Sequence, residues 1–198
     1  MPLYRATRAE VLSSLADEFL HNYGRGRAFL AVDGGPLADP AGVARDLADA
    51  LRADGRGAYV AEAADFASEA AAQAGAEAGA GEVDADALRD GLVRPFRRAG
   101  TPFALRPDAD PVTDAPDDAV LVVAGDALQA PELRGLWNAV VYLLLPDEPL
   151  ASSGGDAGSA AQEAHARYIR AVNPRRAATM IVDVSDPDLP RRVFADSC

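Results

Sequence analysis

Lysine is absent from this chain of 198 residues, so all 19 side chains counted as lysine or arginine are arginines. Aspartate and glutamate together number 31, which gives a formal net charge of −12. Nucleic acids and anionic membrane surfaces are bound by clustered positive charge. The composition therefore argues against a general nucleic-acid partner and against a membrane partner.

The chain has one cysteine, Cys198, and two histidines, His21 and His165. A single cysteine cannot form a disulfide framework, and the histidines lie far apart and outside any zinc-binding spacing, so we expect no metal site. We expect both histidines at the surface or at its boundary. The longest apolar runs are far shorter than the ~20 residues that span a bilayer. The charged N-terminal segment lacks the apolar core of a signal peptide, and we expect a soluble, cytoplasmic protein.

Short apolar runs alternate with amphipathic segments along most of the chain. The apolar runs predict strands over residues 28–32, 58–61, 119–124, 140–145 and 179–184. The amphipathic segments predict helices over residues 7–22, 39–52, 84–98, 131–137 and 160–172. Strands that are apolar on both faces and separated by helices are typical of a covered parallel sheet. With right-handed crossovers, this predicts an α/β fold, a three-layer sandwich around a doubly wound five-stranded parallel sheet.

Two stretches interrupt this alternation. Residues 67–83 are rich in alanine, glycine and glutamate, and residues 151–160 are rich in glycine and serine. We expect both to be mobile, because such compositions bury little apolar surface. Neither is long enough to separate domains, so we expect residues 1–198 to form a single domain.

The segment AVDGGPLADPAG, residues 31–42, lies where the first predicted strand leads into a helix. A phosphate loop of this kind follows GxxxxGK[ST], in which backbone N–H groups and the lysine hold phosphates and the hydroxyl binds Mg²⁺. If Gly34 is the first glycine, Asp39 stands at the second glycine, Pro40 at the lysine and Ala41 at the hydroxyl residue. The candidate phosphate-loop positions are Gly34, Gly35, Asp39, Pro40, Ala41 and Gly42.

The replacements in this loop remove phosphate-binding groups and add a negative charge. Proline has no N–H group to donate. Two like unit charges 4 Å apart repel by about 1 kcal/mol in water and by about 4 kcal/mol at an effective dielectric constant of 20. Aspartate, proline and alanine are instead favoured residues for a helix start. We therefore predict that the Asp39 carboxylate accepts hydrogen bonds from first-turn N–H groups, at the place of a phosphate.

Motifs beyond this loop resemble those of one kinase family. In order, they are LAVDGGPLADPAGVARDLADALRADGR, AEAADF, VLVVAGDALQAPELRGLWNAVVYLLLP and NPRRAATMIVDVSDPDLPRRV. The chain resembles the uridine kinase-like branch of the P-loop kinases, which is related to phosphoribulokinase and pantothenate kinase. ELRGLW and DVSDPDLP are the most specific stretches, and the resemblance covers most of the chain. It implies a P-loop NTPase fold of the nucleoside kinase-like type and an ATP-dependent phosphotransferase ancestry.

The chain departs from this family where the chemistry would take place. The resemblance places the catalytic base at Ala64, the acid that orders Mg²⁺ at Ala124, and the lid arginines at Ser152 and Asp156. Only Asp65 of the acidic pair remains. Phosphoryl transfer depends on positioning and charge neutralisation. We therefore expect a catalytically silent pseudoenzyme with a binding or regulatory role, an unidentified small-molecule or protein partner, and no cofactor.

Two alternatives remain open at this point. An active nucleoside-type kinase would bind ATP and Mg²⁺ through a non-standard loop, with Arg45 or Arg175 in place of the lysine and Asp65 as the base. A homodimeric structural or interaction protein would use its alanine-rich surface to associate. Calorimetry with Mg²⁺-ATP separates a silent protein from an active kinase, and light scattering detects the dimer.

Overall fold

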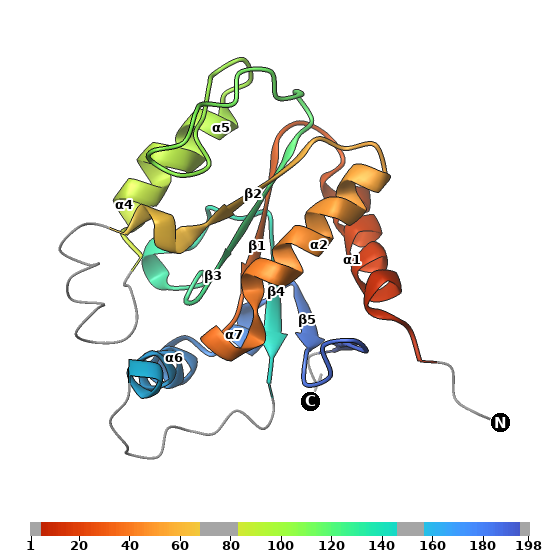
Figure 1. Ribbon diagram of the computed structural model, residues 1–198, viewed down its shortest axis with the longest axis vertical. Helices are drawn as coiled ribbons and strands as arrows, with labels where there is room; N and C mark the ends of the chain where they lie inside the picture. The colour runs from red at the N-terminus through yellow and green to blue at the C-terminus, as the bar shows by residue number, and fades with distance from the viewer. Residues whose placement is uncertain (1–4, 68–82, 146–156, 195–198) are drawn as a thin grey trace.

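The computed structural model describes residues 5–67, 83–145 and 157–194, and Figure 1 shows their arrangement. The α-helices are α1 (Arg8–Tyr23), α2 (Pro40–Ala53), α4 (Ala85–Leu88), α5 (Arg94–Arg97), α6 (Ala157–Val172) and α7 (Pro174–Ala177). The strands are β1 (Ala28–Asp33), β2 (Ala58–Glu62), β3 (Val120–Gly125), β4 (Ala139–Leu144), β5 (Met180–Asp183) and β6 (Arg191–Val193). No helix within these residues is both long enough and apolar enough to cross a membrane.

The strands form one sheet in the order β2-β3-β1-β4-β5-β6. The first five pair in parallel, and β6 pairs antiparallel to β5 through Asp183 and Arg191. The predicted three-layer α/β fold is confirmed, but the predicted count of five strands is wrong because the sheet has six. The edge strand β6 is three residues long and partly exposed, and its sequence RRV carries no apolar run.

Helices cover both faces of the sheet (Figure 1), and the strands alternate between two apolar cores. In β1, Leu30 and Val32 pack toward α1 and α2, whereas Phe29 and Ala31 pack on the opposite side. That second core contains residues of the helical stretch from α4 to α5. Burial on both faces explains why β1 and β3 read as continuous apolar runs.

Three predicted helices differ from the observed ones. The stretch 84–98 is helical, but its middle part, η3 (Arg89–Val93), is a π-helix. In 131–137, only the 3₁₀ turn η4 (Pro131–Leu133) forms, because Arg134 is extended and Gly135 has a φ of 81°. Helix α6 begins at Ala157, so the last four residues of the glycine- and serine-rich stretch belong to it. Residues 68–82 and 146–156, including Ser152 and Asp156, lie outside the described residues.

The sheet order creates a switch point beside β1. The chain leaves β1 toward β2 on one side and later reaches β4 on the other side. In open α/β sheets, ligands bind outside the carboxyl ends of the strands at such a point. The fold therefore directs attention to the segments that follow β1, β2 and β3.

Candidate functional site

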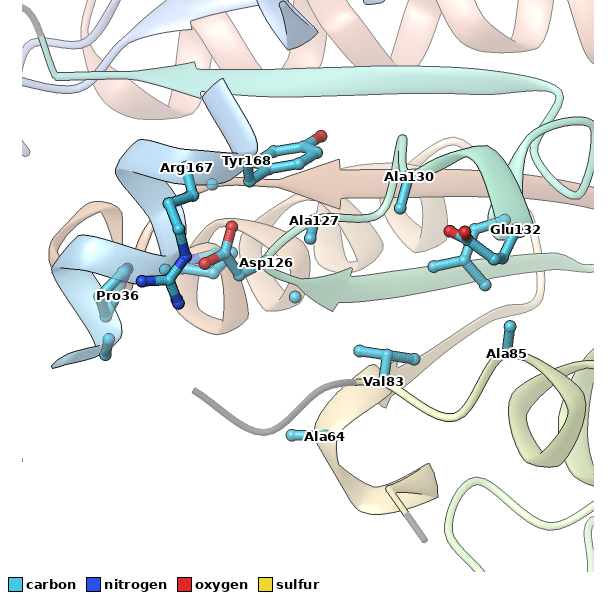
Figure 2. A pocket seen from close by; sticks show the side chains of 16 residues that line it. Pro36, Ala64, Val83, Ala85, Asp126, Ala127, Ala130, Glu132, Arg167 and Tyr168 are labelled. Carbon is cyan, nitrogen blue, oxygen red and sulfur yellow. The ribbon is translucent and has the colours of Figure 1, made fainter. Parts of the chain in front are cut away.

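A cavity of about 620 Å³ lies at the carboxyl ends of the strands. Its lining comes from the segments after β1, β2 and β3, from the chain leading into α4, and from α6. Figure 2 shows that most of the labelled side chains are small and apolar, with Asp126, Glu132, Arg167 and Tyr168 as the larger polar ones. Small-molecule sites are concave, largely apolar spaces of this size with a few placed polar groups, so this cavity is the candidate binding site.

The loop after β1 packs closely against the neighbouring strand. A Cβ atom added to Gly34 would lie 2.9 Å from the Cβ of Leu143, so glycine is required there by packing alone. The 3₁₀ turn η1 (Pro36–Ala38) follows, and Asp39 then adopts a left-handed conformation with φ 48° and ψ 58°. Packing against Leu143 therefore explains the glycine at position 34 without any bound phosphate.

The Asp39 carboxylate caps helix α2. Its Oδ1 accepts a hydrogen bond from the Gly42 N–H at 3.0 Å, which confirms the predicted N-cap. The Val43 N–H donates to the Asp39 carbonyl at 3.1 Å, and Pro40 has no N–H group. Within the described residues, Ala41 therefore has the one first-turn N–H of α2 without a hydrogen bond. The start of the helix offers an anion very few donors.

Asp39 and Gly42 depend on each other sterically. A Cβ atom added to Gly42 would lie 2.1 Å from Oδ2 of Asp39. Any other residue at position 42 would therefore displace the carboxylate from its amide. Of the six predicted loop positions, only Gly34 and Pro40 line the cavity.

The remaining predicted catalytic positions are not brought together at the cavity. The 3₁₀ turn η2 (Ala63–Phe66) follows β2 and turns Ala64 into the cavity lining, whereas Asp65 is exposed and is not part of that lining. Ala124 is buried in the core with α1 and α2. Arg45 on α2 and Arg175 on α7 are exposed and also lie outside the lining.

A buried carboxylate lies at the end of β1. Asp33 accepts hydrogen bonds from the Leu128 N–H at 3.1 Å, from Nε2 of Gln129 at 2.8 Å and from the Tyr168 hydroxyl. Burial raises the pKa of Asp33 above its ordinary value, although these three hydrogen bonds act to lower it. The pKa of Tyr168 is also raised, by burial and by the charge of Asp33, so Tyr168 keeps its proton. This network ties α6 to the ends of β1 and β3.

A second polar contact holds α6 at the cavity. Nδ1 of His165 lies 2.6 Å from Oδ1 of Asp126, which follows β3 and lines the cavity. His165 is only 2% exposed, so the expectation of a surface or boundary position is wrong for this histidine. His165 is buried because it lies three residues before Tyr168, and residues three apart share one face of a helix. This face of α6 packs on the strand ends.

The charges that face the cavity were not identified from the sequence. Arg167 is the only basic residue in the described lining, while Asp126 and Glu132 are acidic. By sequence, residues 68–82 and 146–156 contain no arginine, lysine or histidine, so neither stretch can supply a second cation. The helical spacing of Ala161, Ala164 and Arg167 was the one available signal for this lining face. In the described residues, no group of three or more His, Cys, Asp or Glu side chains could hold a metal ion.

No model of a known protein family matches this chain, and neither does any curated protein. Solved structures do match. One, described as a possible uridine kinase from Bacillus stearothermophilus, has a TM-score of 0.64 and 20% identity, over 86% of this chain and 96% of that one. Another, a candidate fructose transport system kinase from Silicibacter sp. TM1040, has a TM-score of 0.57 and 22% identity, over 81% of this chain and 94% of that one. The chain therefore has the fold of the uridine kinase-like P-loop kinases.

Proposed function

We propose that this chain is a catalytically silent protein with a kinase fold, which binds a small molecule in the cavity without transferring a phosphoryl group. The observation that carries the proposal is the hydrogen bond from the Gly42 N–H to the Asp39 carboxylate. Phosphate groups bind helix N-termini through free N–H groups. Here a negatively charged side chain of the protein occupies that amide.

The charge of the cavity supports the same conclusion. A nucleoside triphosphate carries several negative charges, and kinases neutralise them with a lysine, arginines and metal ions. The described lining has Arg167 as its one cation, together with the acidic residues Asp126 and Glu132. Asp39 adds a further carboxylate at the loop. Transition-state charge would therefore meet repulsion where a kinase supplies attraction.

The base is the third part of the argument. Transfer to a hydroxyl group is assisted by a base within hydrogen-bond reach of that hydroxyl. The side chain that follows β2 into the cavity is Ala64, and the neighbouring Asp65 is outside the lining. The carboxylates of the described lining, Asp126 and Glu132, do not stand at the predicted base position, and the predicted substitute cations Arg45 and Arg175 lie outside the lining.

Isothermal titration of the full chain with Mg²⁺-ATP tests this proposal. We expect no heat of binding up to millimolar nucleotide, and no ADP release in a coupled assay with nucleosides or sugars. The matched variant D39G/P40K/A41T restores the phosphate-loop residues and should gain measurable affinity. Micromolar binding by the unaltered chain would contradict the proposal. The homodimer stays a separate prediction, which light scattering of the same sample tests.

A further inference from the structure

We propose that the cavity takes a bipolar small molecule, with an anionic group at Arg167, a cationic amine at Glu132 and an apolar body between them. This inference rests on the proposed function, because a nucleotide held by an active kinase would occupy the same region. It names the chemical class of the ligand, which the fold alone does not.

Arg167 provides the positive end of the cavity. It lies on α6 and is exposed, and within the described residues its guanidinium group forms no hydrogen bond or ion pair. Arg52, Arg56 and Arg89 differ from it, since each binds both a carboxylate and a backbone carbonyl. Figure 2 shows the Arg167 side chain extending toward Pro36, at the altered loop. A guanidinium group in this position suits a carboxylate or another compact anion.

Glu132 provides the negative end. It lies in η4, across the cavity from Arg167 in Figure 2. Arg89 contacts Glu132 through the backbone and not through the carboxylate. Nη2 of Arg89 donates to the backbone carbonyl of Glu132 at 2.9 Å, and Nη1 of Arg89 binds the carboxylate of Asp86. The Glu132 carboxylate therefore has no cation among the described side chains.

Asp126 is not equivalent to Glu132. Its Oδ1 lies 2.6 Å from Nδ1 of His165, which is buried, so part of this carboxylate is already engaged within the protein. In Figure 2, Asp126 lies on the Arg167 side of the cavity. An ammonium group placed there would be repelled by Arg167, whereas at Glu132 it meets no such charge. Asp126 in turn repels an anion at Arg167, so the ligand's anionic group fits on the side of the guanidinium group that faces Pro36 (Figure 2).

The walls between these ends are short and apolar. Ala127 and Ala130 line the stretch between Asp126 and Glu132, and Ala64, Val83 and Ala85 lie along another side (Figure 2). Such side chains leave room for a hydrocarbon or aromatic body. A ligand with only negative groups would be repelled by Glu132, and one with only positive groups by Arg167. An uncharged ligand would desolvate both charges without pairing them.

Ligand-observed NMR titration of the full chain with three matched probes tests the inference. The zwitterion is 4-(aminomethyl)benzoic acid, its N-acetyl derivative keeps only the carboxylate, and its methyl ester keeps only the ammonium group. We expect the zwitterion to bind about tenfold more tightly than either derivative, since one charge pair is lost in each. Equal affinities for the three probes, or no detectable binding of the zwitterion, would overturn the inference.

Two variants assign each charge to its partner. R167Q should weaken binding of the zwitterion and the N-acetyl derivative about tenfold, and should not weaken binding of the methyl ester, which Arg167 repels. E132Q should weaken binding of the zwitterion and the methyl ester about tenfold, and should not weaken binding of the N-acetyl derivative, which Glu132 repels. The controls R170Q and E163Q lie on α6, are exposed and do not line the cavity, and should change nothing. If the loss of affinity in each variant does not depend on which charge the probe carries, the assignment of Arg167 and Glu132 is wrong.

A parallel titration with Mg²⁺-ATP separates this inference from the proposed function. If Mg²⁺-ATP does not bind and the three probes bind equally, the bipolar ligand is wrong and catalytic silence stands. If Mg²⁺-ATP binds at micromolar concentration and displaces the zwitterion, both the proposed function and the inference resting on it are wrong.

Discussion

Replacing Gly42 by alanine tests whether the Asp39 carboxylate occupies the start of α2. A Cβ atom at position 42 would lie 2.1 Å from Oδ2 of Asp39, so the carboxylate must leave the Gly42 N–H. Loss of an N-cap costs about 1 kcal/mol. Alanine within a helix gains about 0.5–1 kcal/mol over glycine. In the natural background these effects oppose each other, and we expect G42A to be neutral or destabilised by up to about 0.5 kcal/mol.

The same substitution has the opposite effect when Asp39 is replaced by glycine. D39G removes the carboxylate and suits the left-handed φ of 48°, which glycine adopts without steric cost. G42A should then stabilise the protein by about 0.5–1 kcal/mol through helix propensity alone. The effect of G42A on the free energy of unfolding should therefore differ between the two backgrounds by about 1 kcal/mol, which is the coupling free energy of the cap.

Urea unfolding followed by circular dichroism at pH 7 measures this cycle on four proteins: the natural chain, G42A, D39G and the double variant. The pair R45A and R45G calibrates the alanine–glycine difference at an exposed position of α2. If G42A stabilises both backgrounds equally, the carboxylate does not bind the Gly42 N–H. The central observation behind the proposed function would then be wrong.

Two further substitutions test the polar contacts around the strand ends. Y168F removes the hydroxyl that donates to the buried Asp33, and we expect a loss of about 1–3 kcal/mol in the free energy of unfolding in urea; unchanged stability would show that the hydroxyl is not needed there. S185A removes the hydroxyl that donates to Asp183 at 2.6 Å. Burial acts to raise the pKa of Asp183, but hydrogen bonds from Ser185 and Arg191 outweigh it and hold this pKa below 3.8. A lowered folded-state pKa stabilises the fold above the ordinary pKa of aspartate, and this stabilisation is lost as the pH falls through the folded-state pKa. S185A should therefore cost about 1–2 kcal/mol at pH 7, and the loss should shrink as Asp183 is protonated in acid; a loss independent of pH would contradict this account.

Most of the fold follows from the sequence because the central strands are buried on both faces. β1 and β3 read as apolar runs, and their observed bounds differ from the predicted ones by one residue at the ends. β6 lies at the sheet edge, pairs on one side only and contains two arginines, so its pattern is that of a loop. Its side chains contribute through long-range contacts, of Arg191 with Asp183 on β5 and of Arg192 with Glu18 on α1, which no local pattern indicates.

The π-helical segment η3 shows how tertiary packing adjusts a local pattern. Leu88, Leu92 and Phe96 are spaced by four, which would drift around a regular helix of 3.6 residues per turn. All three are fully buried. A π-helix is wider per turn, so η3 keeps this spacing on the face that packs against the sheet. The sequence predicts the helix, while the sheet beneath it selects the wider turn.

The Asp39 cap and the charged residues of the cavity differ in how far they can be predicted from the sequence. The cap formed by Asp39 is predictable, because its chemistry lies within four residues of chain. Arg167, Glu132 and Asp126 come from different elements and meet only after the crossovers have formed. Nothing in their local sequence distinguishes them from other solvent-exposed charges.

In the loop between β1 and α2, a side chain of the loop itself caps the start of the helix. First-turn N–H groups of a helix need partners from outside the helix. In α2, Pro40 removes one such donor, the Asp39 carboxylate satisfies Gly42, and the Asp39 carbonyl satisfies Val43. Among the described residues, only the Ala41 N–H of this turn is left without a partner. We therefore expect a ligand of this cavity to be recognised by the charges left unpaired there among the described residues, Arg167 and Glu132.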